Sequence, residues 1–194
     1  MDAQLARALG DYARAWSDAA RMERAGLPVL AHQALALERT GQTLEAAGSG
    51  LSRDVRAALV RTPELAHGHE QPEGMVALGR AVDGARRERL ALEKRGRETV
   101  RRWNVLEREY DAAGKLYEWS TQREVGTRME AFAQALKRDL PLDGVLRERG
   151  RELGIIEGSR LDRVVRAKEV DRTLTRAIGI EHGPRQSFGL SLGM

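Results

Sequence analysis

Apolar residues recur at three- and four-residue intervals along nearly the whole chain, and this spacing marks one face of an α-helix. The clearest run is Val125, Met129, Phe132, Leu136 and Leu140. No segment alternates apolar and polar residues at every second position, as a half-buried strand would. Because such a stripe must be buried against other helices, the pattern predicts an all-α fold of several packed antiparallel helices, with few strands or none.

Glycine and proline divide the N-terminal part of this pattern into helices. The first helix is expected to end near Gly26, and Pro28 suits the first turn of the second, where its missing N–H costs nothing. The second helix should stop at residues 48–50 (Gly-Ser-Gly), after which Ser52 is the expected N-cap of a short helix. Residues 67–74, rich in glycine and histidine, are the expected loop.

A very long helical pattern then runs from Met75 to about Tyr117 or Trp119. A helix of about 40 residues would be roughly 60 Å long at about 1.5 Å per residue. Four glycines inside it are candidate kinks or interruptions, at positions 79, 84, 96 and 114.

The last third continues in shorter pieces. Pro141 is expected to close the amphipathic run, a short helix should end at Gly154, and Gly158–Ser159 should begin another helix that includes Leu174 and Ile178. From residue 179 the composition shifts to Gly, Pro, Ser, His and Arg, which predicts a flexible tail over residues 179–194.

The charge balance bears on the kind of partner. The chain has 33 Lys and Arg against 29 Asp and Glu, a net charge of +4 and a pI near 9.8. That balance would suit nucleic acid or an acidic protein surface. The signs alternate along the chain, however, so a solvated face of mixed charge is the simpler interpretation.

The chain has no cysteine, which excludes disulfides, thiolate metal sites and thiol catalysis. No secretory signal is visible at the N-terminus, and the longest apolar stretch, Leu27–Leu37, is far too short to span a bilayer. We therefore expect a soluble, cytoplasmic protein that does not insert into membranes.

Three enzyme-like patterns lack the partners that their chemistry needs. Gly189–Gly193 fits the nucleophile elbow, but no histidine follows Ser191. Glu64 and His67 match half of a helical di-iron site, and no second such pair exists. The pair His67 and His69 lies in the expected loop, where a metal site would lack further ligands. No phosphate-binding loop is present, so we expect no catalytic residue, metal, cofactor or small-molecule substrate.

Two basic regions are candidate binding surfaces. The first interleaves Trp103, Tyr110, Tyr117 and Trp119 with Arg101, Arg102 and Arg108. Aromatic residues at helical spacing favour a core role, with stacking on single-stranded nucleic acid as the alternative. The second is the densest basic region and contains Arg147, Arg149, Arg151, Arg160, Arg163, Arg166 and Lys168, half compensated by Glu148, Glu152, Glu157 and Asp162. A solvated helix face is the simpler interpretation of this region, and a docking surface for an acidic partner is the alternative.

Several stretches resemble a known family. They are Leu37–Thr40, Ser52–Leu59, Arg102–Trp103, Ala135–Leu142 and Leu146–Ile155. Together they resemble the C-terminal region of conjugative relaxases of the Ti-plasmid TraA type. That region is similar to the BID domain, the delivery domain of Bartonella type IV secretion effectors. The likeness covers roughly residues 35–156, and its motifs are degenerate helical patterns.

The resemblance implies an elongated antiparallel four-helix bundle with a small hook or cap, followed by a basic flexible tail. It divides the chain into an N-terminal helix (1–27), a BID-like bundle (28–156), and a C-terminal helix with the tail (157–194). The implied function is a translocation signal recognised by the type IV coupling ATPase. The nickase and helicase of the parent relaxase are not in this chain, and DNA would be reached only through that parent.

The resemblance also implies that the chain is a monomer in the donor bacterium and is carried to recipient cells through the secretion system. The candidate partner-binding residues are the arginines of the second basic region and of the tail, namely Arg147, Arg149, Arg151, Arg160, Arg163, Arg166, Arg172, Arg176 and Arg185. The tail has only a modest excess of positive charge. The alternative function is a helical accessory domain that binds nucleic acid.

Overall fold

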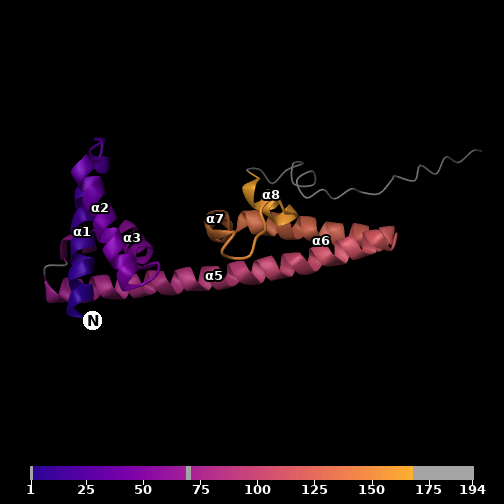
Figure 1. The fold of residues 1–194 in the computed structure, drawn as a ribbon, viewed down its shortest axis with the longest axis horizontal. Helices are drawn as coiled ribbons and strands as arrows, with labels where there is room; N and C mark the ends of the chain where they lie inside the picture. Colours follow the sequence, from indigo (N-terminus) through magenta and orange to yellow (C-terminus); the bar gives the residue numbers. More distant parts are fainter. Residues whose placement is uncertain (1, 69–70, 168–194) are drawn as a thin grey trace, which may run out of the picture. The chain divides into compact units, whose positions relative to one another are not determined.

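The computed structural model describes residues 2–68 and 71–167, and within these ranges every regular element is an α-helix (Figure 1). The described residues contain no strand, which confirms the predicted all-α class. No helix in these ranges is long and apolar enough to cross a membrane. The predicted tail over residues 179–194, with Leu174 and Ile178 before it, lies outside the described residues.

The chain packs as two units, residues 1–91 and residues 92–194. The boundary falls inside helix α5 (Pro72–Lys115), which gives its first part to one unit and its second part to the other. The division of the chain at residues 27 and 156, expected from the resemblance, stays a prediction.

The first unit contains α1 (Ala3–Arg24), α2 (Ala31–Ala47), α3 (Leu51–Arg61), α4 (Leu65–Gly68) and the first part of α5. Its core is made mainly of alanine, leucine and valine, with one tyrosine. The buried residues are Ala8, Leu9, Tyr12, Ala13, Leu44, Val55, Ala58, Leu59, Ala66, Leu78 and Val82.

Three details of this unit correct the sequence-based prediction. Pro28 precedes α2, whose N-cap is Leu30, and is not in its first turn. The N-cap of α3 is Gly50 rather than Ser52, because the chain enters this helix in the left-handed region (φ 75°), which glycine adopts readily. The expected loop at 67–74 is shorter, since α4 extends to Gly68 and α5 begins at Pro72.

The Ser52 side chain does not cap α3 by accepting a backbone N–H of its first turn. Its hydroxyl donates to the carboxylate of Glu45 on α2, which also accepts the backbone N–H of Gly50 at 2.7 Å. The Ser52 hydroxyl and then the Gly50 N–H lower the pKa of Glu45. A carboxylate from the preceding helix therefore caps the start of α3.

The second unit contains the rest of α5, α6 (Trp119–Arg138), α7 (Leu140–Arg149) and α8 (Arg160–Arg166). Helices α5 and α6 run antiparallel as a hairpin, with α7 and α8 beside it (Figure 1). One apolar cluster joins all four helices and consists of Val100, Trp103, Leu106, Tyr110, Val125, Met129, Ala133, Leu136, Leu142, Leu146, Leu153, Ile155, Leu161, Val164 and Val165. The rings of Trp103 and Phe132 lie 6.0 Å apart between their centres.

Most of the amphipathic run is confirmed, because Val125, Met129 and Leu136 are buried and Phe132 packs against them. Leu140 is the exception, at 75% exposed. Helix α6 ends at Arg138, and Asp139 caps α7 by accepting the N–H of Leu142 at 3.3 Å. Leu140 therefore opens a new helix and no longer shares the buried face of α6.

Two helix ends come earlier than predicted, because α7 ends at Arg149 rather than at Gly154, and α8 ends at Arg166, before Leu174 and Ile178. Helix α5 is continuous through its four glycines, so none of them interrupts it. Ser159 is the N-cap of α8, and its hydroxyl accepts the N–H of Asp162 at 3.2 Å. Pro141 lies in the first turn of α7 and is not simply a terminator of α6.

Candidate partner-binding surface

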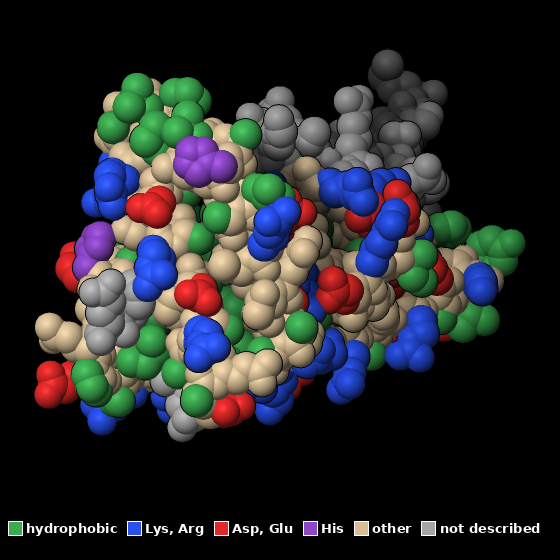
Figure 2. Space-filling view, turned by 60° about the vertical axis from the view of Figure 1, so that its left-hand side comes forward, with side chains coloured by type: hydrophobic (Ala, Val, Ile, Leu, Met, Phe, Trp, Pro, Cys, Tyr) green, Lys and Arg blue, Asp and Glu red, His purple; other side chains and the backbone are tan. Residues whose placement is uncertain are grey.

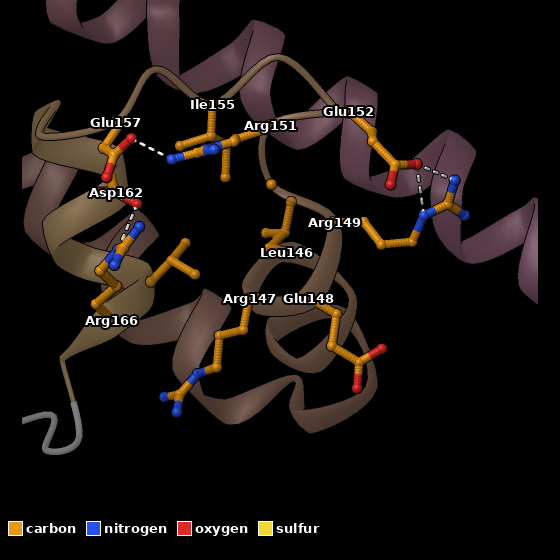
Figure 3. Close-up of a pocket in the computed structure, with 12 residues that line it drawn as sticks. Leu146, Arg147, Glu148, Arg149, Arg151, Glu152, Ile155, Glu157, Asp162 and Arg166 are labelled. Atoms are coloured by element: carbon orange, nitrogen blue, oxygen red, sulfur yellow. Dashed lines mark hydrogen bonds and ion pairs between the residues drawn. The ribbon is translucent and has the colours of Figure 1, made fainter.

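Six of the nine predicted partner-binding arginines lie on α7, on α8 or between them. They are Arg147, Arg149, Arg151, Arg160, Arg163 and Arg166, and we refer to them as the arginine cap. The other three, Arg172, Arg176 and Arg185, lie outside the described residues. Four of the six line a hollow of about 610 Å³, whose apolar wall contains Leu146, Ile155 and Val165 (Figure 3).

The segment between α7 and α8 is held by backbone geometry and by two apolar anchors. The N–H of Ile155 donates to the carbonyl of Gly150 at 2.8 Å, which folds the chain back after α7. Gly154 then adopts φ 96°, a left-handed conformation that favours glycine. Leu153 and Ile155 on either side of it are buried in the core. These contacts fix the backbone from which Arg149 and Arg151 extend.

Arg149 is held between two carboxylates. It pairs with Glu93 of α5 and with Glu152, and its Nε donates to Glu152 at 2.9 Å. Glu93 is only 6% exposed, so its charge would be costly without a cation beside it. The hydrogen bond that Arg149 donates to Glu152 raises the pKa of Arg149 despite its partial burial. Arg149 therefore attaches the end of α7 to α5.

Arg160 performs the same role at the start of α8. Its guanidinium donates to Asp111 at 2.9 Å and to Glu107 at 3.2 Å, both on α5. It also lies 5.4 Å from the centre of the Tyr110 ring, within cation–π distance. Three contacts on one helix direct this cation inward, toward α5.

A buried lysine completes the connections beneath the cap. Lys137 of α6 donates to Asp143 of α7 at 3.0 Å and to the carbonyl of Val165 of α8 at 2.7 Å. Burial lowers the pKa of Lys137, and the neighbouring carboxylate of Asp143 partly offsets that effect. Arg147 pairs with the second oxygen of Asp143 at 2.9 Å. Sequence reasoning missed this pair because residues six apart across a helix junction share no periodic spacing.

The other arginines of the cap face solvent. Arg151 pairs with Glu157, and Arg166 pairs with Asp162 at 2.8 Å (Figure 3). Arg163 is exposed and has no ion pair with any described residue. The hollow itself is lined by four arginines and by four carboxylates, so its formal charge is zero. Figure 2 shows the same mixture of Lys or Arg with Asp or Glu over the face that it draws.

The aromatic residues of the first basic region divide into two pairs. Trp103 and Tyr110 are buried, which agrees with the core interpretation. Tyr117 and Trp119 at the α5–α6 turn are 75% and 50% exposed, with ring centres 6.0 Å apart. Stacking on nucleic-acid bases could therefore involve only this second pair.

The α5 helix carries a row of exposed cations, of which the sequence analysis singled out only Arg101 and Arg108. We define the α5 stripe as Lys94, Arg97, Arg101, Arg108 and Lys115. None of these five side chains has an ion pair with a described residue. The sequence pattern that could have revealed the stripe is the seven-residue repeat of Lys94, Arg101, Arg108 and Lys115. Acidic residues between these cations obscure the repeat.

Within the described ranges, no three His, Asp or Glu side chains gather in a way that could hold a metal ion. Glu64 and His67 are both exposed, whereas His69, Ser191 and the rest of the Gly189–Gly193 pattern lie outside these ranges. Comparison with family models, curated proteins and solved structures found no match to this chain.

Proposed function

We propose that this chain is the type IV secretion signal domain of a conjugative relaxase, recognised as a folded helical unit by the type IV coupling ATPase. The observation that carries the proposal is where the resembling stretches fall. They lie on α2, on α3, on α5 at Arg102–Trp103, and from α6 to the segment that follows α7. The resemblance thus follows the helical framework of the chain, which is what a delivery domain needs to present.

The finer architecture belongs to the same proposal. In it, the hairpin of α5 and α6 supplies two long helices of an antiparallel four-helix bundle, and the arginine cap supplies the hook. Support comes from the contacts that make the cap rigid, because Arg149, Arg160 and Lys137 each join two helices. A rigid signal costs its receptor less ordering entropy than a mobile one.

The proposed mechanism needs no chemistry from this chain. The coupling ATPase binds the folded surface, and residues 179–194 are engaged by the channel in the donor cell. The attached relaxase, with its DNA, then follows into the recipient.

The test is transfer of a reporter enzyme fused in front of this chain, scored in recipient cells. Deletion of residues 179–194, and deletion of the whole chain, should each abolish transfer without lowering the amount of reporter in donors. A fusion to an unrelated helical bundle of similar size is the control. Undiminished transfer of both deletion variants would overturn the proposal.

A pull-down provides a second readout. The full chain, immobilised and incubated with extract from a conjugation-competent donor, should retain the coupling ATPase. The unrelated bundle should not retain it. Failure to retain the ATPase under low-salt and physiological-salt conditions would contradict direct recognition.

A further inference from the structure

The α5 stripe lies on one face of a single helix. At about 100° per residue, its five side chains fall within a sector of about 60°. Lys94, Arg101, Arg108 and Lys115 follow one another at seven-residue intervals, with Arg97 between the first two. At about 1.5 Å per residue the four are spaced about 10.5 Å apart, over a total of about 32 Å.

This sector contains no carboxylate, whereas both of its edges do. Glu98 and Glu109 lie on one side, and Glu109 pairs with Arg128 of α6 at 3.2 Å. Glu93 and Asp111 lie on the other side, and both pair with arginines of the cap. Three of these four acidic residues thus pair with cations outside the stripe, and no described residue, Glu98 included, forms an ion pair with the stripe.

The stripe also crosses an apolar hollow. Beside Arg101 and Arg108, the exposed side chains of Val105 and Ile156 line a depression of about 760 Å³. Asn104, Glu107 and Asp111 complete the lining, and the two carboxylates pair with Arg160. Ile156 is 75% exposed and Val105 is 44% exposed. The stripe thus places cations at regular spacing around exposed apolar side chains. Protein-binding surfaces have the same arrangement, with an apolar core and a polar, charged rim.

The width of the stripe decides between two classes of anionic partner. Double-stranded DNA carries phosphates on both walls of a wide groove. Beyond the stripe these phosphates would meet Glu98 and the Glu109–Arg128 pair on one side and the Asp111–Arg160 pair on the other, where the cations already have carboxylate partners. A single α-helix is narrow enough to stay on the stripe. A helix with acidic residues every seven positions would also repeat at the same spacing of about 10.5 Å.

We infer that the α5 stripe is a docking surface for an acidic amphipathic α-helix of a partner protein. Carboxylates at seven-residue intervals would pair with Lys94, Arg101, Arg108 and Lys115. One apolar side chain of the partner helix would enter the hollow at Val105 and Ile156. The inference does not rest on the secretion proposal, since any partner that presents such a helix would satisfy it.

The test is a binding titration of the full chain with a fluorescent synthetic helix of about 25 residues, which would span about 37 Å. The helix carries Glu at every seventh position and one central Leu on the same face. A matched helix with Gln in place of each of these Glu residues is the first control. Binding should be at least ten times tighter for the Glu helix and should weaken as salt is added, because exposed charge pairs are screened.

Two double variants locate the surface. The stripe variant, Arg101→Gln with Arg108→Gln, should weaken binding of the Glu helix at least tenfold. The control variant, Arg151→Gln with Arg163→Gln, removes the same amount of charge from the cap and should change the affinity less than twofold. Arg101→Lys with Arg108→Lys should retain most of the binding. Circular dichroism of each variant verifies that the helices are intact.

Three results would overturn the inference. The first is that the Glu helix does not bind. The second is that the stripe and cap variants lose binding equally, which would mean that binding depends on the net charge of the chain and not on the stripe. A duplex DNA of about two helical turns, each about 34 Å, could instead bind more tightly than the helix and lose that binding in the stripe variant. That last result would assign the surface to nucleic acid.

Discussion

The arginine cap and the α5 stripe have similar numbers of cations, but the contacts that these cations make are opposite in kind. In the cap, five of the six arginines have a carboxylate partner, and Arg149 and Arg160 use theirs to join helices. In the stripe, none of the five cations has such a partner among the described residues. The cap is denser in the sequence, yet the stripe has more positive charge available to a partner.

The difference shows that local charge density is a poor guide to a binding surface. Charges that are close in sequence can be neutralised by residues of another helix. In the cap, Glu93 of α5 pairs with Arg149, and Glu107 and Asp111 of α5 pair with Arg160. Substitutions should therefore separate the two regions clearly. Those in the cap should cost stability, and those in the stripe should cost binding only.

The largest effect is expected at Lys137, beneath the cap. Lys137→Met should lower the free energy of unfolding by about 3 kcal/mol, because the Oδ1 atom of the buried Asp143 and the carbonyl of Val165 lose their donor, while Arg147 still pairs with the other oxygen of Asp143. Urea denaturation followed by circular dichroism gives this number. The double variant Lys137→Met with Asp143→Leu should recover part of the loss, since it removes the buried carboxylate oxygen that the single variant leaves without a donor. A single variant as stable as the natural chain would show that the pair does not hold α6, α7 and α8 together.

The next largest loss of stability is expected at Arg149, and Arg151, two residues away, provides the comparison. Arg149→Gln should cost about 2 kcal/mol, because Glu93 is buried and loses a charged donor. Arg151→Gln removes an exposed pair with Glu157 and should cost less than about 0.5 kcal/mol. Thermal and urea unfolding of both variants test the difference. Equal losses would mean that burial of the partner does not distinguish the two arginines.

The helical framework was predictable from the sequence because apolar periodicity is a local signal. The long α5 helix, the buried face of Val125, Met129 and Leu136, and the cap at Ser159 all follow from spacings of three or four residues. Leu140 was assigned wrongly because the spacing continues through a helix junction that only the Asp139 cap reveals.

The candidate sites were less predictable, because they depend on contacts between helices. Nothing in the sequence near Arg149 indicates that its partner is Glu93, 56 residues away. The same holds for Arg89 and the buried Asp54 in the first unit, which pair at 2.7 Å across 35 residues. Which cations remain available to a partner becomes visible only when such pairs have been assigned.

A pH-dependent effect should distinguish Arg166 of the cap from the stripe cations. The hydrogen bond from Arg166 lowers the pKa of Asp162 below its usual value of 3.8. A carboxyl whose pKa is lower in the folded state stabilises the fold above the unfolded value and loses this contribution as pH falls through the folded value. Arg166→Gln should therefore destabilise the fold near neutral pH by the small amount typical of an exposed helical pair, and should have no effect well below pH 3.8. Urea unfolding at several pH values tests this, and a loss that does not change with pH would contradict the assignment.

The smallest effect on the free energy of unfolding is expected in the stripe, where a substitution should stabilise the fold instead of destabilising it. Arg97 lies between Lys94 and Arg101 at spacings of three and four residues, where like charges on a helix repel. Arg101→Gln should relieve part of that repulsion and raise the free energy of unfolding by about 0.3 kcal/mol, with a smaller gain at high salt. Differential unfolding of the variant and the natural chain, each at two salt concentrations, measures it. A loss of stability would mean that Arg101 has a structural partner, and the stripe would then resemble the cap. A gain would show that the chain retains these cations at a cost in stability, as expected if a partner uses them.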